Sequence, residues 1–492
     1  MKLKVKKSRI NASTKTICII HEDNAKKLGV TPLNRIILKH GKKEIAAVVN
    51  TSTSLVSSGE IIINSQLAKI LDVDSGDSIS AEPREMLISK EAIRKKIHNK
   101  PISFSEAREL IHDVEKHKLN DLEISSFLTA TTINGLTDKE VYYLTKAMIE
   151  TGAHLEFGNN SVDKHSIGGV PGDKTTLLLV PIIAASGLRM PKTSSRAITS
   201  PAGTADRMEV LAPVKKTKVQ ITKIIKDTGG CIVWGGSFNL APADDQFIEI
   251  ERPLNQDSML LPSVLSKKKV VGSKYVIIDI PVGPEAKVKT KKEGKELGLK
   301  FRRVGKMLGM NVDYVLTNGK QPIGHALGPA LEAREALEIL IARKNHYLIK
   351  KVVELAAAMF LIKKRVRTLK QGRTLALLII KSGRAEEKLR EIIKAQGGNP
   401  NIMPDKIKIG KLHKNVLAHK SGKVKYISIH ALQRISRLAG SPQNKKSGIF
   451  LNKKLNEKVK KGEVLYTIYA EHKNKLKNAV NFSKKNNAYI IK

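Results

Sequence analysis

The stretch V-D-K-H-S-I-G-G-V-P-G-D-K-T-T, residues 162–176, decides the fold that the sequence predicts. It reads as a short strand ending in Lys164 and Ser166, a glycine-rich turn, and an apolar helix from about Lys174. This order is typical of an α/β domain. Glycines let backbone N–H groups approach an anion, and a helix N-terminus adds partial positive charge. The stretch predicts a phosphate-binding loop, with a purely structural turn as the alternative, because its spacing matches neither a Walker A motif nor a dinucleotide fingerprint.

A second polar segment follows, K-T-S-S-R-A-I-T-S-P-A-G-T-A-D, residues 192–206. Six donor side chains fall within eleven residues: Ser194, Ser195, Arg196, Thr199, Ser200 and Thr204. An arginine forks onto phosphate oxygens, and hydroxyls fill the remaining lone pairs. Together the two segments predict a site for two phosphates.

Residues 1–84 precede this region and form a β-rich segment that contains a weak internal repeat. Short β-branched runs alternate with polar turns. Seven residues recur at a spacing of 43, from Ile19, Ile20, Ala25, Lys26, Leu28, Val30 and Ile36 to Ile62, Ile63, Ala68, Lys69, Leu71, Val73 and Ile79. A duplicated strand–helix–strand unit predicts a small barrel with pseudo-twofold symmetry. Because this part holds no catalytic constellation, we expect it to serve assembly.

Helical periodicity begins after residue 84 and predicts a helical domain over residues 85–162. Ser105 is the expected N-cap of one helix, and Thr137 with Glu140 forms a capping box ahead of another. The central α/β domain is expected over 163–245 and 273–399, with the chain passing again through the helical domain near 246–272.

Three segments of this central domain carry a secondary-structure prediction. Residues 274–283 and 374–381 are apolar runs that predict buried strands, and 328–362 predicts helices. A turn cluster at 397–400 then opens a final α+β domain, residues 400–492, with strands at 425–430, 447–452 and 463–470 and a tight turn at 459–463.

Charge is the unusual feature of the composition, with 88 Lys and Arg against 46 Asp and Glu. Residues 401–492 are the most basic part, with 22 basic and 4 acidic residues. Aromatic residues make up only 4%, with Trp234 the single tryptophan, so there is little material for stacking bases. We therefore expect anionic substrates and solvated lysine faces rather than specific binding of nucleic acid.

The two cysteines, Cys18 and Cys231, are far apart and stand in no metal-ligand spacing. No disulfide framework or bound metal is expected. The basic N-terminus has no apolar segment behind it, and the longest apolar run is broken by Pro181. We expect a soluble, cytoplasmic protein without a membrane anchor.

The two polar segments together carry a resemblance. D-K-H-S-x-G-G and the following S-x-R…G-T-x-D block are similar to the thymidine/pyrimidine-nucleoside phosphorylase family. N-L-A-P-A-D-D (239–245), S-V-L-S-K-K (263–268) and G-x-A-x-G-P-A-L-E-A-R-E-A-L (324–337) extend it over roughly residues 86–490. The resemblance implies a multidomain α/β protein: a helical domain and a large α/β domain of nucleoside phosphorylase type, which close on each other, plus a C-terminal α+β domain.

Departures from the family pattern indicate a branch of it. Pro171 lies in a one-residue insertion, Ser200 replaces a histidine, and Lys287 replaces a phenylalanine. The 84-residue N-terminal extension is also absent from the nucleoside-cleaving relatives. These departures resemble the branch of the family that acts on nucleoside 5′-monophosphates, AMP among them. Lys287 adds a cation that could bind the second phosphate.

The reaction that the resemblance implies is phosphorolysis. Inorganic phosphate attacks C1′ of AMP, CMP or UMP and releases the free base and ribose 1,5-bisphosphate, with no cofactor. The resemblance also implies a homodimer or a higher homo-oligomer. Two alternatives stay open: a phosphorylase of unphosphorylated nucleosides, and a nucleic-acid-binding protein on an inactive phosphorylase fold.

Roles carry over from the family residue by residue. Asp257 matches the proton donor to the departing base, with a helix cap as the alternative, and a carboxylic acid in that role needs burial or a neighbouring acid to stay protonated. His165 is expected to be structural, since phosphate is already an anionic nucleophile. The residues that match nucleotide contacts are Gly169, Ser195, Arg196, Ala197, Ile198, Thr199, Ser200, Thr204, Ser263 and Lys287. Those that match ligands of inorganic phosphate are Lys164, Ser166, Thr176 and Ser194, and the sequence leaves open which phosphate each donor holds.

Overall fold

The computed structural model describes residues 1–10, 16–83, 87–152, 154–158, 160–197, 200–237, 241–254, 256–343 and 346–492. The chain divides into two compact units. Unit 1 comprises Met1–Gly152 and Ala241–Ser266, and unit 2 comprises Ala153–Leu240 and Lys267–Lys492. The boundary at 266 falls inside one helix, α11, Leu260–Val270.

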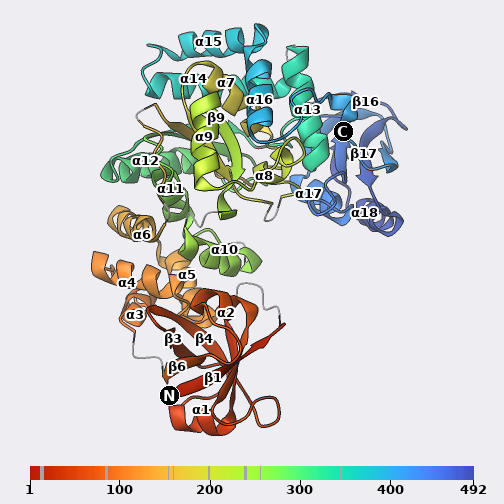
Figure 1. The fold of residues 1–492 in the computed structure, drawn as a ribbon. Helices are drawn as coiled ribbons and strands as arrows, with labels where there is room; N and C mark the ends of the chain where they lie inside the picture. The colour runs from red at the N-terminus through yellow and green to blue at the C-terminus, as the bar shows by residue number, and fades with distance from the viewer. Residues whose placement is uncertain are drawn as a thin grey trace. The chain divides into compact units, whose positions relative to one another are not determined.

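Unit 1 begins with a closed barrel of six strands in the order β1-β5-β2-β4-β3-β6 (Figure 1). The strands are Lys2–Ser8 (β1), Ile17–His21 (β2), Arg35–His40 (β3), Lys43–Ser52 (β4), Glu60–Asn64 (β5) and Ser78–Pro83 (β6). Short helices, Glu22–Leu28 (α1) and Ser65–Leu71 (α2), follow β2 and β5.

The pairing of these strands has a twofold pattern that matches the repeat in the sequence. β1 is parallel to β5 as β4 is parallel to β2, and β1 is antiparallel to β6 as β4 is antiparallel to β3. The first residues of β2 and β5, Ile17 and Glu60, are 43 positions apart, and so are those of α1 and α2. Each half contributes one apolar face, so that neither half buries its side chains without the other.

The rest of unit 1 is helical. Its helices are Ser89–Ile97 (α3), Phe104–Glu115 (α4), Asp121–Asn134 (α5), Asp138–Thr151 (α6) and Pro242–Leu254 (α10). Helix α10 comes from much later in the chain and packs against α4 and α5. The capping box of Thr137 with Glu140 is confirmed. The prediction for Ser105 was wrong, because the cap is Ser103, which has a glutamate three residues on, at Glu106, to complete the reciprocal pair of hydrogen bonds.

Unit 2 is built on parallel strands. β11-β10-β7 form one sheet and β8-β9 another, and an isolated parallel bridge between Ser161 and Arg189 lies between them. The strands are Val162–Ser166 (β7), Met190–Ser194 (β8), Gly230–Trp234 (β9), Tyr275–Val282 (β10) and Asn311–Asn318 (β11). The helices are Thr175–Ala185 (α7), Thr204–Met208 (α8), Lys218–Thr228 (α9), Lys291–Met307 (α12), Pro329–Ala342 (α13), Tyr347–Ile362 (α14), Leu369–Lys381 (α15) and Arg384–Ala395 (α16).

Helix α7 is the centre of the core of this unit. It is apolar on every side, and residues 175–184 are all buried, as expected for a helix enclosed by other elements. It packs against β8, β9, α14 and α16. The glycine turn that precedes α7 is therefore attached to a helix buried in the core of the unit.

The strand predicted at residues 374–381 is wrong, because this segment lies in helix α15. Ala376, Ile379 and Ile380 are buried while Leu378 is exposed, which is helical spacing. Thr368 caps the helix by accepting a hydrogen bond from the backbone of Gln371. In a short apolar run the periodicity does not distinguish a buried strand from a buried helix. Here the segment is a helix that packs against α14.

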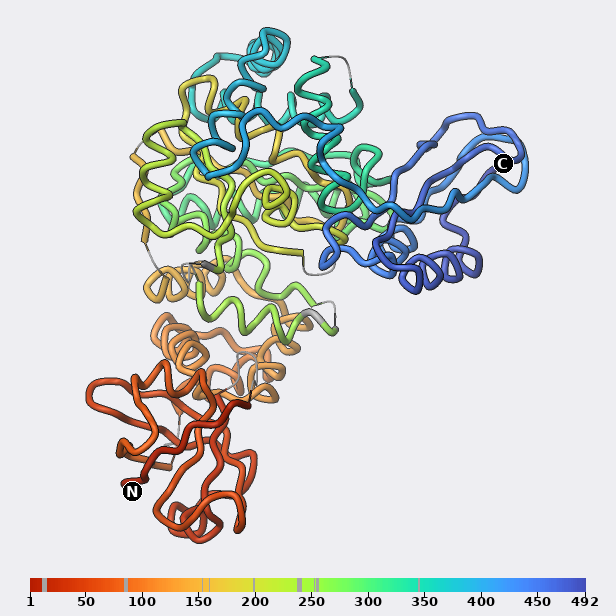
Figure 2. The backbone as a smooth tube through the Cα atoms, turned by 45° about the vertical axis from the view of Figure 1, so that its right-hand side comes forward, coloured from red at the N-terminus to blue at the C-terminus, as the bar shows by residue number. Residues whose placement is uncertain are grey.

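The C-terminal part of unit 2 forms a lobe of strands, drawn in blue in Figure 2. Its strands are Leu412–Leu417 (β13), Gly422–Ile427 (β14), Gly448–Leu451 (β15), Lys458–Val459 (β16), Val464–Ala470 (β17) and Tyr489–Ile491 (β18), and its helices are Ile429–Leu438 (α17) and Lys473–Lys485 (α18). The sequence does not predict that β12, Ala326–Leu327, pairs with β15 and joins this sheet. We call residues 412–491 the C-terminal lobe.

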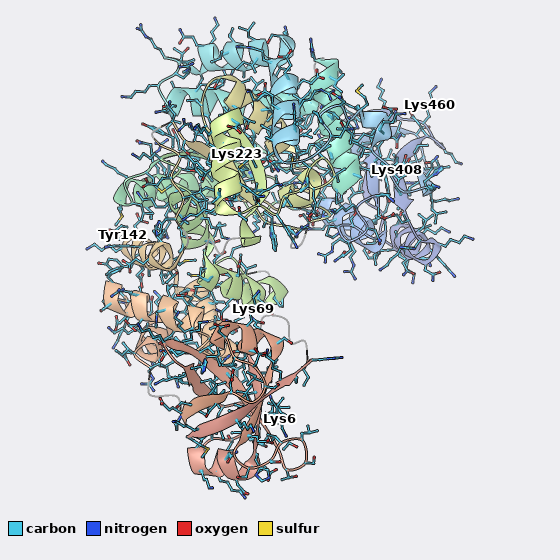
Figure 3. All side chains as sticks on the ribbon, viewed as in Figure 1. Lys6, Lys69, Tyr142, Lys223, Lys408 and Lys460 are labelled. Carbon is cyan, nitrogen blue, oxygen red and sulfur yellow. The ribbon has the colours of Figure 1, made fainter. Side chains whose placement is uncertain are left out.

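Exposed lysines lie on elements of both units. The lysines labelled in Figure 3 come from β1 (Lys6), α2 (Lys69), α9 (Lys223) and the last hundred residues (Lys408 and Lys460), and all are exposed. This spread favours solvated lysines over a single nucleic-acid surface. No helix in the described part of the chain combines the length and the apolar character needed to cross a bilayer.

Candidate active site

The predicted phosphate ligands of unit 2 meet at one edge of its parallel strands. Lys164 and Ser166 lie at the carboxyl end of β7, Ser194 is the last residue of β8, and Lys287 follows the end of β10. In open α/β sheets the crevice outside the carboxyl ends of the strands is where ligands bind. The segments 162–176 and 192–206 thus reach the same edge as the loop that carries Lys287, which lies more than eighty residues further along the chain.

The glycine turn contacts the loop that carries Lys287. Gly169 has φ +87°, and a Cβ placed there would lie 2.9 Å from the backbone N of Lys287 and 3.0 Å from its Cγ. Only a glycine therefore allows the two loops to approach so closely. Gly172 plays the same role at the other end of the turn, since its Cβ would lie 2.5 Å from the carbonyl oxygen of Ile323.

Lys164 is buried between two acidic side chains. Its Nζ lies 3.1 Å from Asp279 and 3.4 Å from Asp173, and Lys351 contacts Asp279 at 2.8 Å. Burial lowers the pKa of Lys164, but the two carboxylates outweigh it, so the net effect is a raised pKa. The ammonium group is therefore charged in the pH range where phosphate is an anion.

A second group of buried charges lies behind the first. Asp163 contacts Lys268 at 2.6 Å and Lys192 at 3.4 Å, and the Nζ of Lys192 donates to the carbonyl oxygen of Lys164 at 2.7 Å. Burial, only partly offset by Asp163, lowers the pKa of Lys192 to about 7. With Lys164, Lys351, Asp173 and Asp279 the two groups contain four lysines and three aspartates, and an anion bound at this edge of the sheet would favour the charged form of Lys192.

Sequence reasoning missed most of this network. Asp279 and Lys192 each stand inside a buried strand, and a charge in such a position needs a partner. That signal was present in the sequence. Nothing in the helical pattern around Lys351 distinguishes it from the neighbouring Lys350.

His165 lies between these lysines and is half-buried. Burial first, and then the positive charges of Lys268, Lys192, Lys267 and Lys164, hold the pKa of the imidazole well below its ordinary value. The ring is neutral at neutral pH and a poor proton acceptor. This environment supports the structural role expected for it.

The second polar segment folds over Gly203. A Cβ there would lie 2.5 Å from the backbone N of Ala197, and Asp206 accepts hydrogen bonds from Ala197 N (2.7 Å) and Gly203 N (2.8 Å). Ser195 is exposed, the hydroxyl of Ser200 donates to the carbonyl of Ala202 (3.0 Å), and Arg207 donates to the hydroxyl of Thr204 (3.4 Å). The predicted contacts Ile198 and Thr199 lie outside the described residues.

Arg196 is bound by two acidic side chains. Its two terminal nitrogens donate to both carboxylate oxygens of Glu209, at 2.7 and 2.6 Å, and one of them also donates to Asp206 at 3.1 Å. The hydrogen bonds from Arg196 are the first cause that lowers the pKa of Glu209 to about 2. The guanidinium thus forms a fork on the carboxylate of Glu209 within its own loop.

Thr176 is buried in the first turn of α7. The preceding Lys174 is also buried, pairs with Glu335 at 2.7 Å and donates to the carbonyl of Ile323 at 2.8 Å. These contacts hold the start of the helix against the loop at 322–326.

Asp257 and Ser263 belong to unit 1, whereas the other predicted site residues belong to unit 2. The side chain of Asp257 is exposed, so within this structure burial does not supply the condition that a protonated carboxylic acid needs. Its neighbour Glu251 is buried and accepts from Ser258 Oγ (2.8 Å) and Met259 N (3.0 Å). Burial raises the pKa of Glu251, and the negative charge of Asp257 adds to that effect. Glu251 therefore holds the turn that carries Asp257.

One group in the described residues has the donor set of a metal site, namely Glu109, His112 and Asp113 of α4, whose ligand atoms lie within 4.8 Å of one another. Asp113 accepts a hydrogen bond from Ser89 at 2.6 Å and contacts Lys118 at 3.9 Å. The carboxylate thus already has protein partners, and the group lies apart in sequence from every predicted site residue.

Three family models match in order along the chain. They are "Glycosyl transferase family, helical bundle domain" at residues 90–152, "Glycosyl transferase family, a/b domain" at 158–386 and "Pyrimidine nucleoside phosphorylase C-terminal domain" at 423–490. The fold is also that of anthranilate phosphoribosyltransferase (TrpD) from Thermus thermophilus, with a TM-score of 0.51, 19% identity, and coverage of 62% of this chain and 99% of that one. The glycosyl transferase models, together with the curated relatives that follow, identify a pentosyltransferase.

Curated relatives match nearly the whole chain. AMP phosphorylases from Thermofilum pendens, Thermococcus kodakarensis and Methanosarcina mazei are 41%, 45% and 42% identical, over 97%, 94% and 95% of this chain and 92% of each relative. The chain belongs to the AMP phosphorylase family.

The loop that packs on Gly172 is held from the C-terminal lobe by Lys454, and this contact predicts a pH effect. Lys454 is buried, and its Nζ donates to the carbonyls of Pro322 (2.6 Å) and Gly324 (2.7 Å). Burial, assisted by the charge of Lys174, lowers the pKa of Lys454 from 10.5 to about 7. Between those values the unfolded chain binds a proton that the folded chain lacks, so raising the pH favours folding, by up to about 1.4 kcal/mol per pH unit.

We expect Lys454→Met to remove this contribution. The free energy of unfolding, measured in urea at pH 7, 8 and 9, should rise less steeply with pH in the variant than in the wild type. Lys460→Met, which replaces an exposed lysine of the same lobe, is the control and should keep the wild-type slope. Equal slopes for wild type and Lys454→Met would contradict the prediction.

Proposed function

We propose that this protein catalyses the phosphorolysis of nucleoside 5′-monophosphates, with AMP as the main substrate and CMP and UMP as further candidates. The products are the free base and ribose 1,5-bisphosphate. The observation that carries the proposal is the contact of Gly169 with Lys287, which adds a second cation at the strand edge that already holds Lys164. One cation serves the attacking phosphate and the other serves the 5′-phosphate. The names of the relatives support the same reaction.

The site divides the work between two groups of residues. Lys164, Ser166, Thr176 and Ser194 hold inorganic phosphate by charge and hydroxyl donors, and the network behind Lys164 keeps its ammonium in place. An oxygen of the phosphate then forms a bond to C1′ while the bond from C1′ to the base nitrogen breaks. Catalysis of this kind rests on positioning and on electrostatic stabilisation.

The nucleotide is held by the other group. The candidates for contact with it are Gly169, Ser195, Ala197, Ser200, Thr204 and Ser263, and Lys287 is the candidate partner of its 5′-phosphate. Arg196 acts at one remove, by binding Glu209 and fixing the fold of its segment. The base leaves with the electron pair of the broken bond and takes up a proton, for which Asp257 is the candidate donor.

We further propose that the protein needs no cofactor, acts in the cytoplasm and forms a homodimer or a larger homo-oligomer. The barrel of residues 1–84 is the candidate for the assembly contact. Charge spread over exposed lysines of several elements supports small anionic substrates rather than a specific nucleic acid (Figure 3).

Release of base from AMP, CMP, UMP and adenosine, with and without inorganic phosphate, tests the reaction. We expect release only with phosphate, one ribose 1,5-bisphosphate per base, and a kcat/KM for AMP on the order of a hundredfold above that for adenosine, the value of one charge-assisted hydrogen bond. Release without phosphate would identify a hydrolase. Equal rates on adenosine and AMP would identify a nucleoside phosphorylase.

A further inference from the structure

The loop at residues 283–288, which we call the Lys287 loop, is a compact turn at the end of β10. The backbone N of Gly283 donates to the carbonyl of Val288 (3.1 Å), and Ala286 N donates to the carbonyl of Gly283 (3.1 Å). A Cβ at Gly283 would lie only 2.3 Å from the carbonyl oxygen of Gly319, so the turn also packs tightly on the end of β11. A displacement at one position of such a turn moves the whole turn, Lys287 included.

Glu285, two residues before Lys287, binds the C-terminal lobe. Its carboxylate accepts from the hydroxyl of Tyr426, from the hydroxyl of Ser428 at 3.0 Å, and from the backbone N of His430 at 2.8 Å. Ser428 and His430 are the N-cap and second residue of α17, where a negative charge is favoured. Burial raises the pKa of Glu285, but these donors outweigh it and lower it overall, so the carboxylate is ionised and the contacts are charge-assisted.

The same lobe also contacts the second site segment. The Nζ of Lys445 lies 2.6 Å from Glu209, the carboxylate that binds Arg196. Lys445 and Glu285 are on different elements and use different partners. An ion pair and a group of charge-assisted hydrogen bonds thus link the C-terminal lobe to the two segments that we assign to the nucleotide.

We propose that Glu285 is a positioning residue for recognition of the 5′-phosphate, because its contacts with Tyr426, Ser428 and His430 fix the Lys287 loop. The C-terminal lobe is then part of the specificity for a phosphorylated substrate. This inference rests on the proposed function. A contact that only stabilised the lobe would affect all substrates alike, whereas a contact that positions Lys287 affects those with a 5′-phosphate.

The test compares Glu285→Ala, Glu285→Gln and Tyr426→Phe in the full-length protein. The measured quantities are kcat, KM for AMP, KM for inorganic phosphate, and kcat/KM for adenosine. Tyr466→Phe is the matched control, since it removes a buried hydroxyl hydrogen bond, to Ser483 at 2.7 Å, inside the same lobe. We expect Glu285→Ala to raise KM for AMP about tenfold and Tyr426→Phe about threefold, the effect of losing one or more positioning hydrogen bonds.

The other parameters separate positioning from stability. In Glu285→Ala, KM for phosphate and kcat/KM for adenosine should stay within about twofold of the wild-type values. Neither inorganic phosphate nor adenosine has the 5′-phosphate that Lys287 is proposed to bind. Glu285→Gln should recover part of the loss, because its amide oxygen still accepts from His430. Tyr466→Phe should lower the melting temperature and leave every KM unchanged.

An unchanged KM for AMP in Glu285→Ala, or a parallel loss with adenosine, overturns the inference and leaves the proposed function intact. If Glu285→Ala does not fold, Tyr426→Phe decides alone, with the same two outcomes. If the wild type releases no adenine from AMP with phosphate, the proposed function fails first, and the inference falls with it.

Discussion

Replacement of Lys164 by Met is expected to lower kcat/KM for phosphorolysis about 10³-fold, the loss seen when a charged or hydrogen-bonding group that stabilises a transition state is removed. Lys164 is the full positive charge at the carboxyl end of β7, and its pKa keeps it protonated. Base release from AMP, measured over a range of phosphate concentrations, should show the loss in kcat as well as in a raised KM for phosphate, because Lys164 holds the phosphate both before and during its attack.

The same substitution also destabilises the fold. Asp173 and Asp279 lose a partner and share Lys351 alone, and breaking a buried pair in this way costs about 3–5 kcal/mol. Lys351→Met is therefore the matched control, because it removes the other lysine on Asp279 without touching the predicted phosphate ligands. It should destabilise to a similar degree but lower kcat/KM less than about tenfold, the effect of a group that acts through another.

Equal losses of activity in the two variants would show that Lys164 serves stability only. If Lys164→Met does not fold, Ser166→Ala removes a hydroxyl donor from the same strand end with much less strain on the core. That variant should raise KM for phosphate about tenfold, the value of one hydrogen bond to an anion.

Lys287→Ala is expected to lower kcat/KM for AMP on the order of a hundredfold and to leave kcat/KM for adenosine unchanged. The side chain is exposed at the strand edge and its loop packs on Gly169, so its removal takes away charge without opening a cavity. The preference for the phosphorylated substrate should fall by the same factor, measured as base release from AMP and adenosine side by side.

Lys289→Ala, which replaces an exposed lysine two residues further on, is the control for a general loss of positive charge. It should change neither rate by more than about twofold, because exposed charges are screened by salt. A fall in adenosine cleavage equal to that in AMP cleavage would show that Lys287 has no part in reading the 5′-phosphate.

The sequence predicted much of the fold because its signals are local. The strand at Tyr275–Val282, the helices Pro329–Ala342 and Tyr347–Ile362 and the repeat of the barrel all follow from periodicity and turn residues. The failures at Ser105 and at residues 374–381 are also informative. Both Ser103 and Ser105 are possible caps, and the hydrogen bonds with Glu106 select Ser103. The run at 374–381 fits a strand or a helix, and its place in helix α15 depends on packing that periodicity does not show.

Arg196 shows a limit of another kind. Its residue type and its polar surroundings predict a phosphate ligand, and carboxylate and phosphate present the same fork geometry to a guanidinium. The structure adds a carboxylate partner that the sequence does not predict, Glu209, thirteen residues away at the end of a short helix.

By itself the sequence determined the glycine turn after β7 and the hydroxyl-rich segment after β8, because each depends on residue type and short spacing, whereas the cation at position 287 was singled out by the resemblance to the phosphorylase family. Only the tertiary structure decided that Gly169 contacts Lys287, that Lys164 is enclosed by Asp173 and Asp279, and that Glu285 is bound by α17. These contacts join residues from 9 to 145 positions apart. Buried charges choose partners by proximity in the folded chain, and proximity arises only when the strands and helices pack.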